Sequence, residues 1–299
     1  MTDSEFRCGF IAVVGRPNVG KSTLINTILG SKISIVTPKP QTTRHRILAV
    51  DSHERYQAVY VDTPGLHRKA GKAMNRLMNR AAVNALADAD LVLFLTEATR
   101  WTEEDQDVLE RLKEVRAPVI AVLNKIDKVH PREALLEALA VMAGRREFAE
   151  VVPICARRRT EIERLCELVP NYLPESEPLF PEDMITDRGE NFRIAETIRE
   201  KLTLALRQEV PYGLTVQVEK MERDEQVIII HAVVWVERDS QKGIVVGKGG
   251  RTLKHVGRAA RLELKALYDQ PVHLELWVKV KDNWADSEKD LVRLGYDMP

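Results

Sequence analysis

The chain has 299 residues, of which 44% are hydrophobic, 30% charged and 5% aromatic. At about 100 to 200 residues per domain, this length predicts two domains, and the near-average composition excludes wholesale disorder and collagen-like chains. Lysine plus arginine and aspartate plus glutamate both total 45, so the net charge of zero gives no sign of a nucleic-acid partner.

Cysteine usage and the N-terminus predict a cytoplasmic protein. Three irregularly spaced cysteines suit neither a disulfide framework nor a zinc motif, which fits a reducing compartment. No basic flank precedes the first short apolar run, so we expect no signal peptide. The apolar runs fall far below the roughly 20 residues of a spanning helix, which leaves only peripheral association with the inner face of the cell membrane open.

Residues 1 to about 170 alternate apolar runs with amphipathic helical patterns. Five of these runs are typical of buried strands, at 10–14, 56–62, 91–95, 118–123 and 151–154. Such alternation predicts an α/β fold with a doubly wound, mostly parallel sheet. Ligands of these sheets bind at the carboxyl ends of the strands.

Four prolines between residues 170 and 181, interleaved with glutamates, predict a linker. We therefore expect a first domain over 1–172, a proline-rich linker over 173–184 and a second domain over 185–299. The second domain shows an α+β pattern with an antiparallel strand pair. Its expected elements are a helix at 188–208, strands at 214–221 and 226–237, two helices around a glycine turn at 247–250, and a strand at 272–280.

The segment GRPNVGKS at 15–22 matches G-x-x-x-x-G-K-[ST] and lies between an apolar strand and a helix. Gly15 and Gly20 let successive backbone N–H groups point at a phosphate. Lys21 would reach the β- and γ-phosphates, and the Ser22 hydroxyl would bind Mg²⁺. This motif predicts a nucleotide triphosphate site.

The segment DTPGL at 62–66 follows a predicted strand about forty residues later. Asp62 can hold the magnesium ion through water, and the Gly65 amide can bond the γ-phosphate and so sense its presence.

The segment NKID at 124–127 follows another predicted strand on the same sheet edge. The Asp127 carboxylate can accept two hydrogen bonds from guanine, a donor pair that adenine lacks. The Lys125 stem could cover the base, and Asn124 could tie this loop to the phosphate loop. The three motifs together favour GTP over ATP, and an ATP-dependent small-molecule kinase is the weaker alternative.

These motifs, with QTTRH at 41–45, resemble those of the Era family of P-loop GTPases, whose members carry a C-terminal KH domain. The resemblance implies that a threonine of QTTRH completes the magnesium shell. Thr42 and Thr43 are both candidates, and we favour Thr43. It also implies that Cys155-Ala156 contacts guanine through the backbone, although the family's serine is replaced by Cys155. The predicted GTP-binding residues are Gly15, Arg16, Pro17, Asn18, Val19, Gly20, Lys21, Ser22, Thr23, Asp62, Gly65, Asn124, Lys125, Asp127, Cys155 and Ala156.

The expected catalytic residues are Lys21, Asn18, Thr43 and Gly65, and the expected magnesium ligands are Ser22, Thr43 and Asp62. Leu66 follows the DxxG glycine, where many GTPases use a glutamine to orient the attacking water. We therefore expect slow intrinsic hydrolysis, typical of a switch. Asn18 resembles an asparagine that some GTPases use to bind K⁺, so K⁺ stimulation is a hypothesis.

The segment 244–267 places G-x-x-G between two helices, within a stretch 238–265 that has eight basic and two acidic side chains, a local charge of +6. Glycines admit RNA backbone and neighbouring cations hold its phosphates, so this order of elements predicts a KH fold of the bacterial type II topology. The predicted RNA-binding residues are Gly247, Lys248, Gly249, Gly250, Arg251, Lys254 and Arg258. We expect Trp235 and Trp277 to lie in the core.

The resemblance to the Era family extends through GKGG to the C-terminal region. It implies a monomer that binds the 3′ region of small-subunit (16S) ribosomal RNA and acts in assembly of the 30S subunit. The alternative is a GTPase whose second domain binds protein or a membrane surface, with the basic helix meeting anionic lipid.

Overall fold

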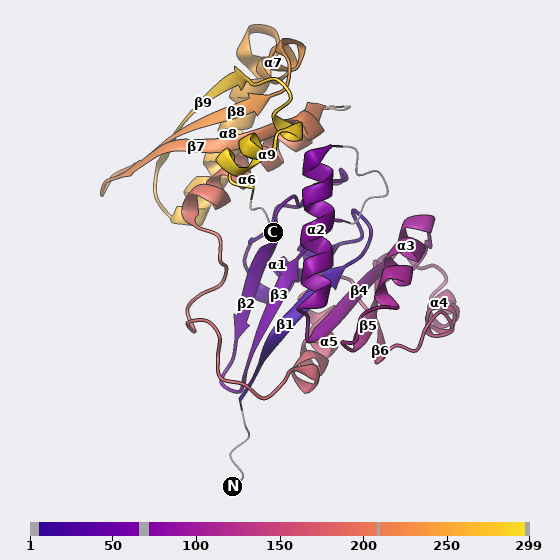
Figure 1. Ribbon diagram of the computed structural model, residues 1–299. Helices are drawn as coiled ribbons and strands as arrows, with labels where there is room; N and C mark the ends of the chain where they lie inside the picture. The colour runs from indigo at the N-terminus through magenta and orange to yellow at the C-terminus, as the bar shows by residue number, and fades with distance from the viewer. Residues whose placement is uncertain (1–5, 66–71, 208–209, 297–299) are drawn as a thin grey trace. The chain divides into compact units, whose positions relative to one another are not determined.

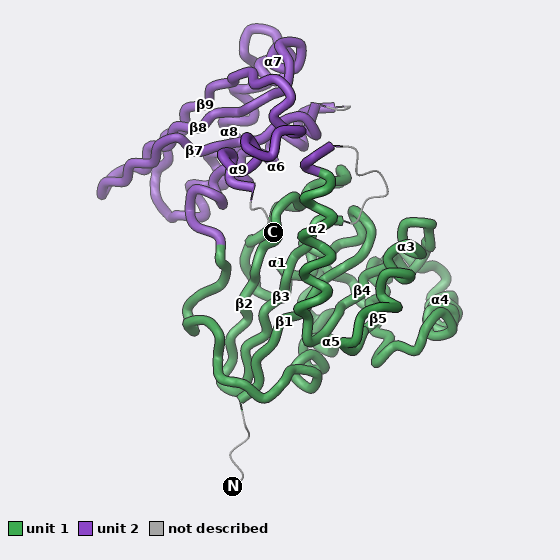
Figure 2. The backbone as a smooth tube through the Cα atoms, viewed as in Figure 1, with its two compact units in different colours: residues 1–70, 75–187, 299 green, residues 71–74, 188–298 purple. Residues whose placement is uncertain are grey.

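The computed structural model describes residues 6–65, 72–207 and 210–296, and these residues form two compact units (Figure 2). Of the described residues, unit 1 contains 6–65 and 75–187, and unit 2 contains 72–74, 188–207 and 210–296. Each unit has its own sheet. Within the described ranges, no helix combines the length and the apolarity needed to cross a bilayer.

The sheet of unit 1 has the strand order β2-β3-β1-β4-β5-β6 (Figure 1). β2 runs antiparallel to β3 and every other pair is parallel, which confirms the doubly wound, mostly parallel sheet. The carboxyl ends of the five parallel strands therefore meet at one edge. The strand bounds are β1 Arg7–Val14, β2 Ile47–Ser52, β3 Tyr56–Asp62, β4 Leu91–Glu97, β5 Val119–Asn124 and β6 Glu150–Pro153.

Strand β2 was missing from the predicted elements. Its apolar run is short and lies between the basic residues 44–46 and a polar turn at 53–55, so the sequence pattern around it is that of a loop. It forms a strand because β3 offers it a free edge with six paired positions.

Helices cover both faces of this sheet. α2 (Ala73–Ala87), α3 (Glu103–Leu112) and α4 (Ala134–Ala143) contribute buried side chains to a core over β1, β4 and β5. α1 (Lys21–Leu29) lies on the opposite face, and α5 (Glu163–Leu168) follows β6 (Figure 1). Strands buried on both faces explain the continuous apolar runs of the sequence.

Unit 2 has the element order expected of a type II KH fold. Strands β7 and β8 are antiparallel, and β9 lies parallel to β8. Helices α6 and α8 pack on one face of this sheet around a common apolar core. The bounds are α6 Glu190–Ala205, β7 Leu214–Arg223, β8 Ile228–Val236, α7 Asp239–Val246, α8 Arg251–Tyr268, β9 Val272–Val280 and α9 Glu288–Arg293.

The proline-rich segment is attached to unit 1 along much of its length. The amide of Cys8 donates to the Pro174 carbonyl at 3.0 Å, and Gln57 Oε1 accepts from the amides of Leu179 and Phe180, each at 2.9 Å. Farther along, the Leu48 amide at the start of β2 donates to Asp187 Oδ1 at 2.9 Å. The expected linker, residues 173–184, therefore has fixed contacts with unit 1, and these contacts continue as far as Asp187.

Candidate nucleotide and RNA sites

The phosphate loop connects β1 to α1 and needs backbone conformations that glycine allows. Gly15 and Gly20 have φ angles of +151° and +113°. A Cβ atom at Gly20 would lie 2.2 Å from Nδ2 of Asn124, so only glycine permits this approach. The loop precedes the N-terminus of α1, an arrangement that favours bound anions.

Lys21 is the first residue of α1 and has 6% of its surface exposed. Its Nζ donates to the carbonyl oxygens of Gly15 at 2.9 Å and Arg16 at 3.2 Å. Burial lowers the pKa of Lys21 to about 8, while the nearby Asp62 carboxylate opposes this shift. Within the described residues, this buried ammonium donates to two neutral carbonyls, so it is well suited to pair with a phosphate oxygen.

Ser22, Thr43 and Asp62 come together from the start of α1, the loop before β2 and the end of β3. Ser22 Oγ donates to Asp62 Oδ2 at 2.8 Å and lies 2.8 Å from Thr43 Oγ1. Asp62 Oδ1 is buried and has no hydrogen-bond partner in the described part of the chain, and burial raises the pKa of this carboxyl group. Two hydroxyls and a carboxylate are oxygen ligands of the kind that Mg²⁺ prefers, so these residues fit the ion.

Thr42, the alternative ligand, points elsewhere. Its hydroxyl donates to the Lys39 carbonyl at 2.7 Å and lies 2.7 Å from Thr37 Oγ1. This arrangement supports Thr43 as the predicted ligand.

Asn124 at the end of β5 connects three segments. Its Nδ2 donates to the Val19 carbonyl at 2.7 Å, and its Oδ1 accepts from the amides of Lys125 at 2.7 Å and Ala156 at 2.9 Å. Lys125 has a positive φ of +64°, which turns the chain toward the exposed Asp127. Cys155 lines the nucleotide cavity, which allows its backbone to contact a ligand, and burial raises the pKa of its thiol.

One cavity of about 570 Å³ collects most of the predicted nucleotide residues. Of these, it is lined by Pro17, Asn18, Gly20, Lys21, Ser22, Thr23, Thr43, Gly65, Asn124, Lys125, Asp127, Cys155 and Ala156. The predicted residues that do not line it are all buried: Gly15, Arg16, Val19 and Asp62. A larger hollow of about 960 Å³ lies beside Tyr56 and Cys166, but it holds none of the motif residues, so we place the chemistry in the smaller cavity.

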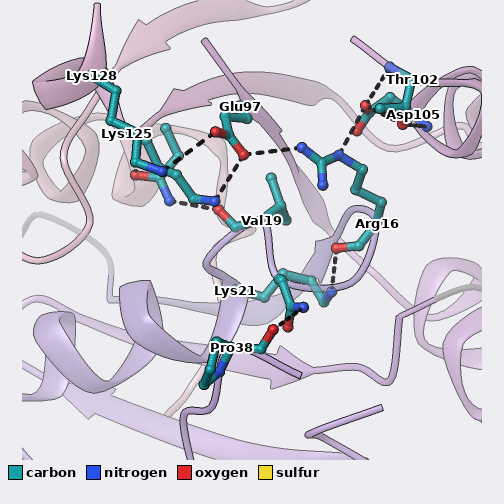
Figure 3. Close-up of polar contacts among 11 residues, drawn as sticks. Arg16, Val19, Lys21, Pro38, Glu97, Thr102, Asp105, Lys125 and Lys128 are labelled. Atoms are coloured by element: carbon teal, nitrogen blue, oxygen red, sulfur yellow. Dashed lines mark hydrogen bonds and ion pairs between the residues drawn. The ribbon is translucent and has the colours of Figure 1, made fainter. Parts of the chain in front are cut away.

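Two acidic residues of this site were not predicted. Arg16 turns away from the cavity, and its guanidinium donates to Glu97 Oε2 and Asp105 Oδ2, each at 3.1 Å (Figure 3). Glu97 also accepts from Lys125 Nζ at 2.8 Å. Glu97 ends β4 at the same sheet edge as the three motifs, and its position two residues after the predicted strand at 91–95 was the available signal.

Leu66, on which the expectation of slow hydrolysis depends, lies outside the described residues. Gly65 is described, and a Cβ there would lie 2.9 Å from Pro17 Cγ, so this glycine closely approaches the phosphate loop.

The G-x-x-G segment of unit 2 lies between α7 and α8, as predicted. Gly247, Gly249 and Gly250 all have positive φ, between +60° and +75°. A Cβ at Gly247 would lie 2.2 Å from Thr252 Oγ1, whereas the nearest atom to one at Gly250 is Lys254 Cε at 4.0 Å. Lys248, Arg251, Lys254 and Arg258 have exposed side chains around this turn.

The expectation that Trp235 and Trp277 lie in the core was wrong for Trp277 and only half right for Trp235. Trp277 is 42% exposed and stacks on His231, with ring centroids 5.5 Å apart. Trp235 is half-buried, and its Nε1 donates to Gln217 Oε1 at 3.1 Å. Both residues alternate with core side chains along their strands, so they point to the other face of the sheet.

A phosphate loop, a hydroxyl-carboxylate site and a guanine-type base loop on one sheet edge, followed by a type II KH fold, define a P-loop GTPase with an appended KH domain. Residues 10–125 match the 50S ribosome-binding GTPase family, and residues 209–285 match the KH domain family. The chain is 50% identical to GTPase Era of Pseudomonas aeruginosa, over 97% of this chain and 95% of that protein. The chain belongs to the Era GTPase family.

Other relatives agree. GTPase Era of Vibrio parahaemolyticus is 49% identical over 97% of this chain and 91% of that protein. A crystal structure of Era with MgGDPNP and nucleotides 1506–1542 of 16S ribosomal RNA is 38% identical, with a TM-score of 0.93, over 97% of this chain and 99% of that chain. A variant of Aquifex aeolicus Era bound to GDP and AlF4⁻ has the same identity, TM-score and coverage.

Proposed function

We propose that this protein is a GTP-hydrolysing switch that binds 16S ribosomal RNA near its 3′ end and acts in assembly of the 30S subunit. The observation that carries this proposal is that the phosphate loop, Ser22, Thr43 and the 124–127 loop line one cavity, with Asp62 hydrogen-bonded to Ser22, in a chain that also has the GKGG turn. The Era structure with MgGDPNP and 16S nucleotides, which matches nearly the whole chain, supports both halves of the proposal.

The geometry of the cavity supports a role for each nucleotide residue. Lys21 and the loop amides would bind the β- and γ-phosphates, and Asp127 would accept hydrogen bonds from guanine. Ser22, Thr43 and Asp62 would hold Mg²⁺, which when bound neutralises charge on the phosphates. Thr43 lies in the QTTRH loop, so its contact with the ion would make the order of this loop depend on the γ-phosphate.

Hydrolysis would be slow because Leu66 offers no group to orient water. Asn18 is proposed to add K⁺ stimulation. Its Nδ2 donates to the Pro38 carbonyl at 2.8 Å and it lines the nucleotide cavity, so its carbonyl oxygen remains available as an ion ligand.

The RNA site would be the GKGG turn and the start of α8. Backbone at Gly247, Gly249 and Gly250 would approach the RNA, while Lys248, Arg251, Lys254 and Arg258 would hold its phosphates. The protein would act as a cytoplasmic monomer. Peripheral contact with anionic lipid through the same basic helix is the competing use of this surface.

A filter-binding titration with the 3′-terminal segment of 16S RNA tests the RNA half. Gly250→Asp should reduce affinity at least tenfold, because a carboxylate then faces the phosphates at a position with room for a side chain. Gly250 has a φ of +75°, where any side chain strains the backbone, so the control must share that strain. It is Gly295→Asp, which adds the same charge at an exposed position of unit 2 with a φ of +83° and no heavy atom near the new Cβ, and it should bind normally. Equal affinities for the two variants, or binding to anionic vesicles that RNA does not displace, would contradict the proposal.

A further inference from the structure

Glu97 lies between the phosphate loop and the base loop and contacts both. Its Oε2 accepts from Lys125 Nζ at 2.8 Å and from Arg16 Nη2 at 3.1 Å, and its Oε1 lies 3.7 Å from Lys128 Nζ (Figure 3). Only 13% of the Glu97 side chain is exposed. One carboxylate at the end of β4 therefore bridges cations from two loops that are 109 positions apart in the sequence, at Arg16 and Lys125.

Arg16 has a second carboxylate partner that fixes its orientation. Its Nε donates to Asp105 Oδ2 at 3.1 Å, and Asp105 is fully buried. Asp105 also accepts from the amide and hydroxyl of Thr102 in the capping box of α3. A continuous polar chain therefore runs from the N-terminus of α3 through Arg16 and Glu97 to Lys125.

The electrostatics of this cluster keep Glu97 charged. Burial raises the pKa of Glu97, but the hydrogen bond from Lys125 and the charges of Lys125, Lys128 and Arg16 outweigh it, and the net shift is downward. A partly buried carboxylate with hydrogen-bonded cations on both sides holds their side chains more firmly than an exposed pair does. Removing its charge would leave Arg16 and Lys125 without a shared partner.

Lys125 also lines the nucleotide cavity, with its backbone in the left-handed region and its ammonium held at Glu97. Both ends of its side chain are therefore fixed, so the aliphatic stem is fixed along the cavity wall. A stem that is already fixed can cover one face of a base at little entropic cost. A mobile lysine would lose rotamer entropy when the base binds.

We propose that Glu97 is a positioning residue for guanine recognition, which clamps Lys125 and Arg16 so that the base loop and the phosphate loop form one preorganised site. The inference rests on the assignment of residues 124–127 as the base loop. The proposal goes beyond that assignment because Glu97 does not line the nucleotide cavity and would act only through Lys125 and Arg16.

The test is Glu97→Gln, which keeps the shape of the side chain and removes its charge. The dissociation constants of GTP and GDP should both rise about tenfold, since the clamp acts on the base end that the two ligands share. The hydrolysis rate at saturating GTP should stay within twofold of the wild type. Glu104→Gln, an exposed position in the first turn of α3, is the matched control and should change neither quantity.

A double-mutant cycle separates positioning from general destabilisation. In a Lys125→Met background, adding Glu97→Gln should weaken GDP binding by clearly less than the tenfold expected in the wild type, because only the contacts with Arg16 and Lys128 are then left to lose. If Glu97→Gln does not fold, as judged by thermal unfolding without nucleotide, Arg16→Met tests the same clamp and should weaken GTP and GDP equally.

Nucleotide affinity within twofold of wild type in the folded variant would overturn the proposal, and so would a lowered hydrolysis rate at unchanged affinity. Failure of the base-loop assignment itself would show differently, as an Asp127→Asn variant that keeps its preference for GTP.

Discussion

The side-chain amide of Asn124 donates a hydrogen bond to the backbone carbonyl of Val19 at 2.7 Å, which ties the end of β5 to the phosphate loop. Asn124 makes two further hydrogen bonds, to the amides of Lys125 and Ala156. We expect Asn124→Ala to reduce the free energy of unfolding by about 2 to 3 kcal/mol, because it removes buried hydrogen bonds and leaves their partners unsatisfied. GDP affinity should fall more than tenfold. Asn84→Ala, at an exposed position on α2, should match the wild type in urea unfolding and GDP titration.

Lys21→Met should abolish GTP binding and yet stabilise the protein without nucleotide. Burial lowers the pKa of Lys21 from 10.5 to about 8, so the folded state carries a cost for the charged form. Below pH 8, Lys21 is protonated in both the folded and the unfolded protein, so folding carries the full cost of burying its charge. Between pH 8 and 10.5 the Lys21 side chain is protonated in the unfolded chain and deprotonated in the folded protein. The free energy of unfolding of the wild type therefore rises with pH in this range.

Urea unfolding of Lys21→Met and wild type at pH 7 and pH 9.5 measures this effect. The variant should be more stable at pH 7 by about 2 kcal/mol, and the difference should shrink at pH 9.5. A variant that is less stable than wild type at pH 7 would contradict the prediction.

Asp127→Asn should shift nucleotide preference from GTP toward xanthosine triphosphate. The amide offers a donor where the carboxylate accepts, and xanthine presents a carbonyl in place of the guanine amine. Competition titrations with GTP, ATP and xanthosine triphosphate check this outcome. Preferential competition by ATP in the wild type would instead point to a kinase.

The cations of α8 should contribute to RNA binding in a salt-dependent way. Lys254→Gln and Arg258→Gln should each reduce the slope of log K against log[salt] by about 0.7, the value for one phosphate contact with a single strand. Lys220→Gln is the control, because Lys220 already pairs with Glu222 at 2.7 Å. A slope unchanged by both α8 variants would remove these side chains from the site.

GTP hydrolysis should be faster in potassium than in sodium buffer, and Asn18→Leu should erase the difference. Leucine removes the carbonyl oxygen that would bind the ion while it keeps a similar volume. Single-turnover rates at equal ionic strength decide the matter, and equal wild-type rates in the two buffers would remove K⁺ from the mechanism.

Most of the nucleotide cavity could be predicted because three motifs each follow a short apolar run bounded by turn signals, a pattern typical of a buried strand. The roles of Glu97 and Asp105 could not, since their meeting with Arg16 depends on the register of β1 against β4, which pairs Val14 with Phe94, and on the cap of α3. Trp277 is exposed, contrary to the prediction, because alternation along β9 decides its side of the sheet. Leu276 and Val278 on either side of it pack against the core, so Trp277 must face outward.

The contacts of the proline-rich segment make it a part of the folded unit 1. Strands β1, β2 and β3 all hydrogen-bond to it, through the amides of Cys8 and Leu48 and the side chain of Gln57. A chain cut after residue 172 would leave these buried or half-buried groups without their partners. Unit 1 ending at residue 172 should therefore unfold at a lower urea concentration than unit 1 ending at residue 187.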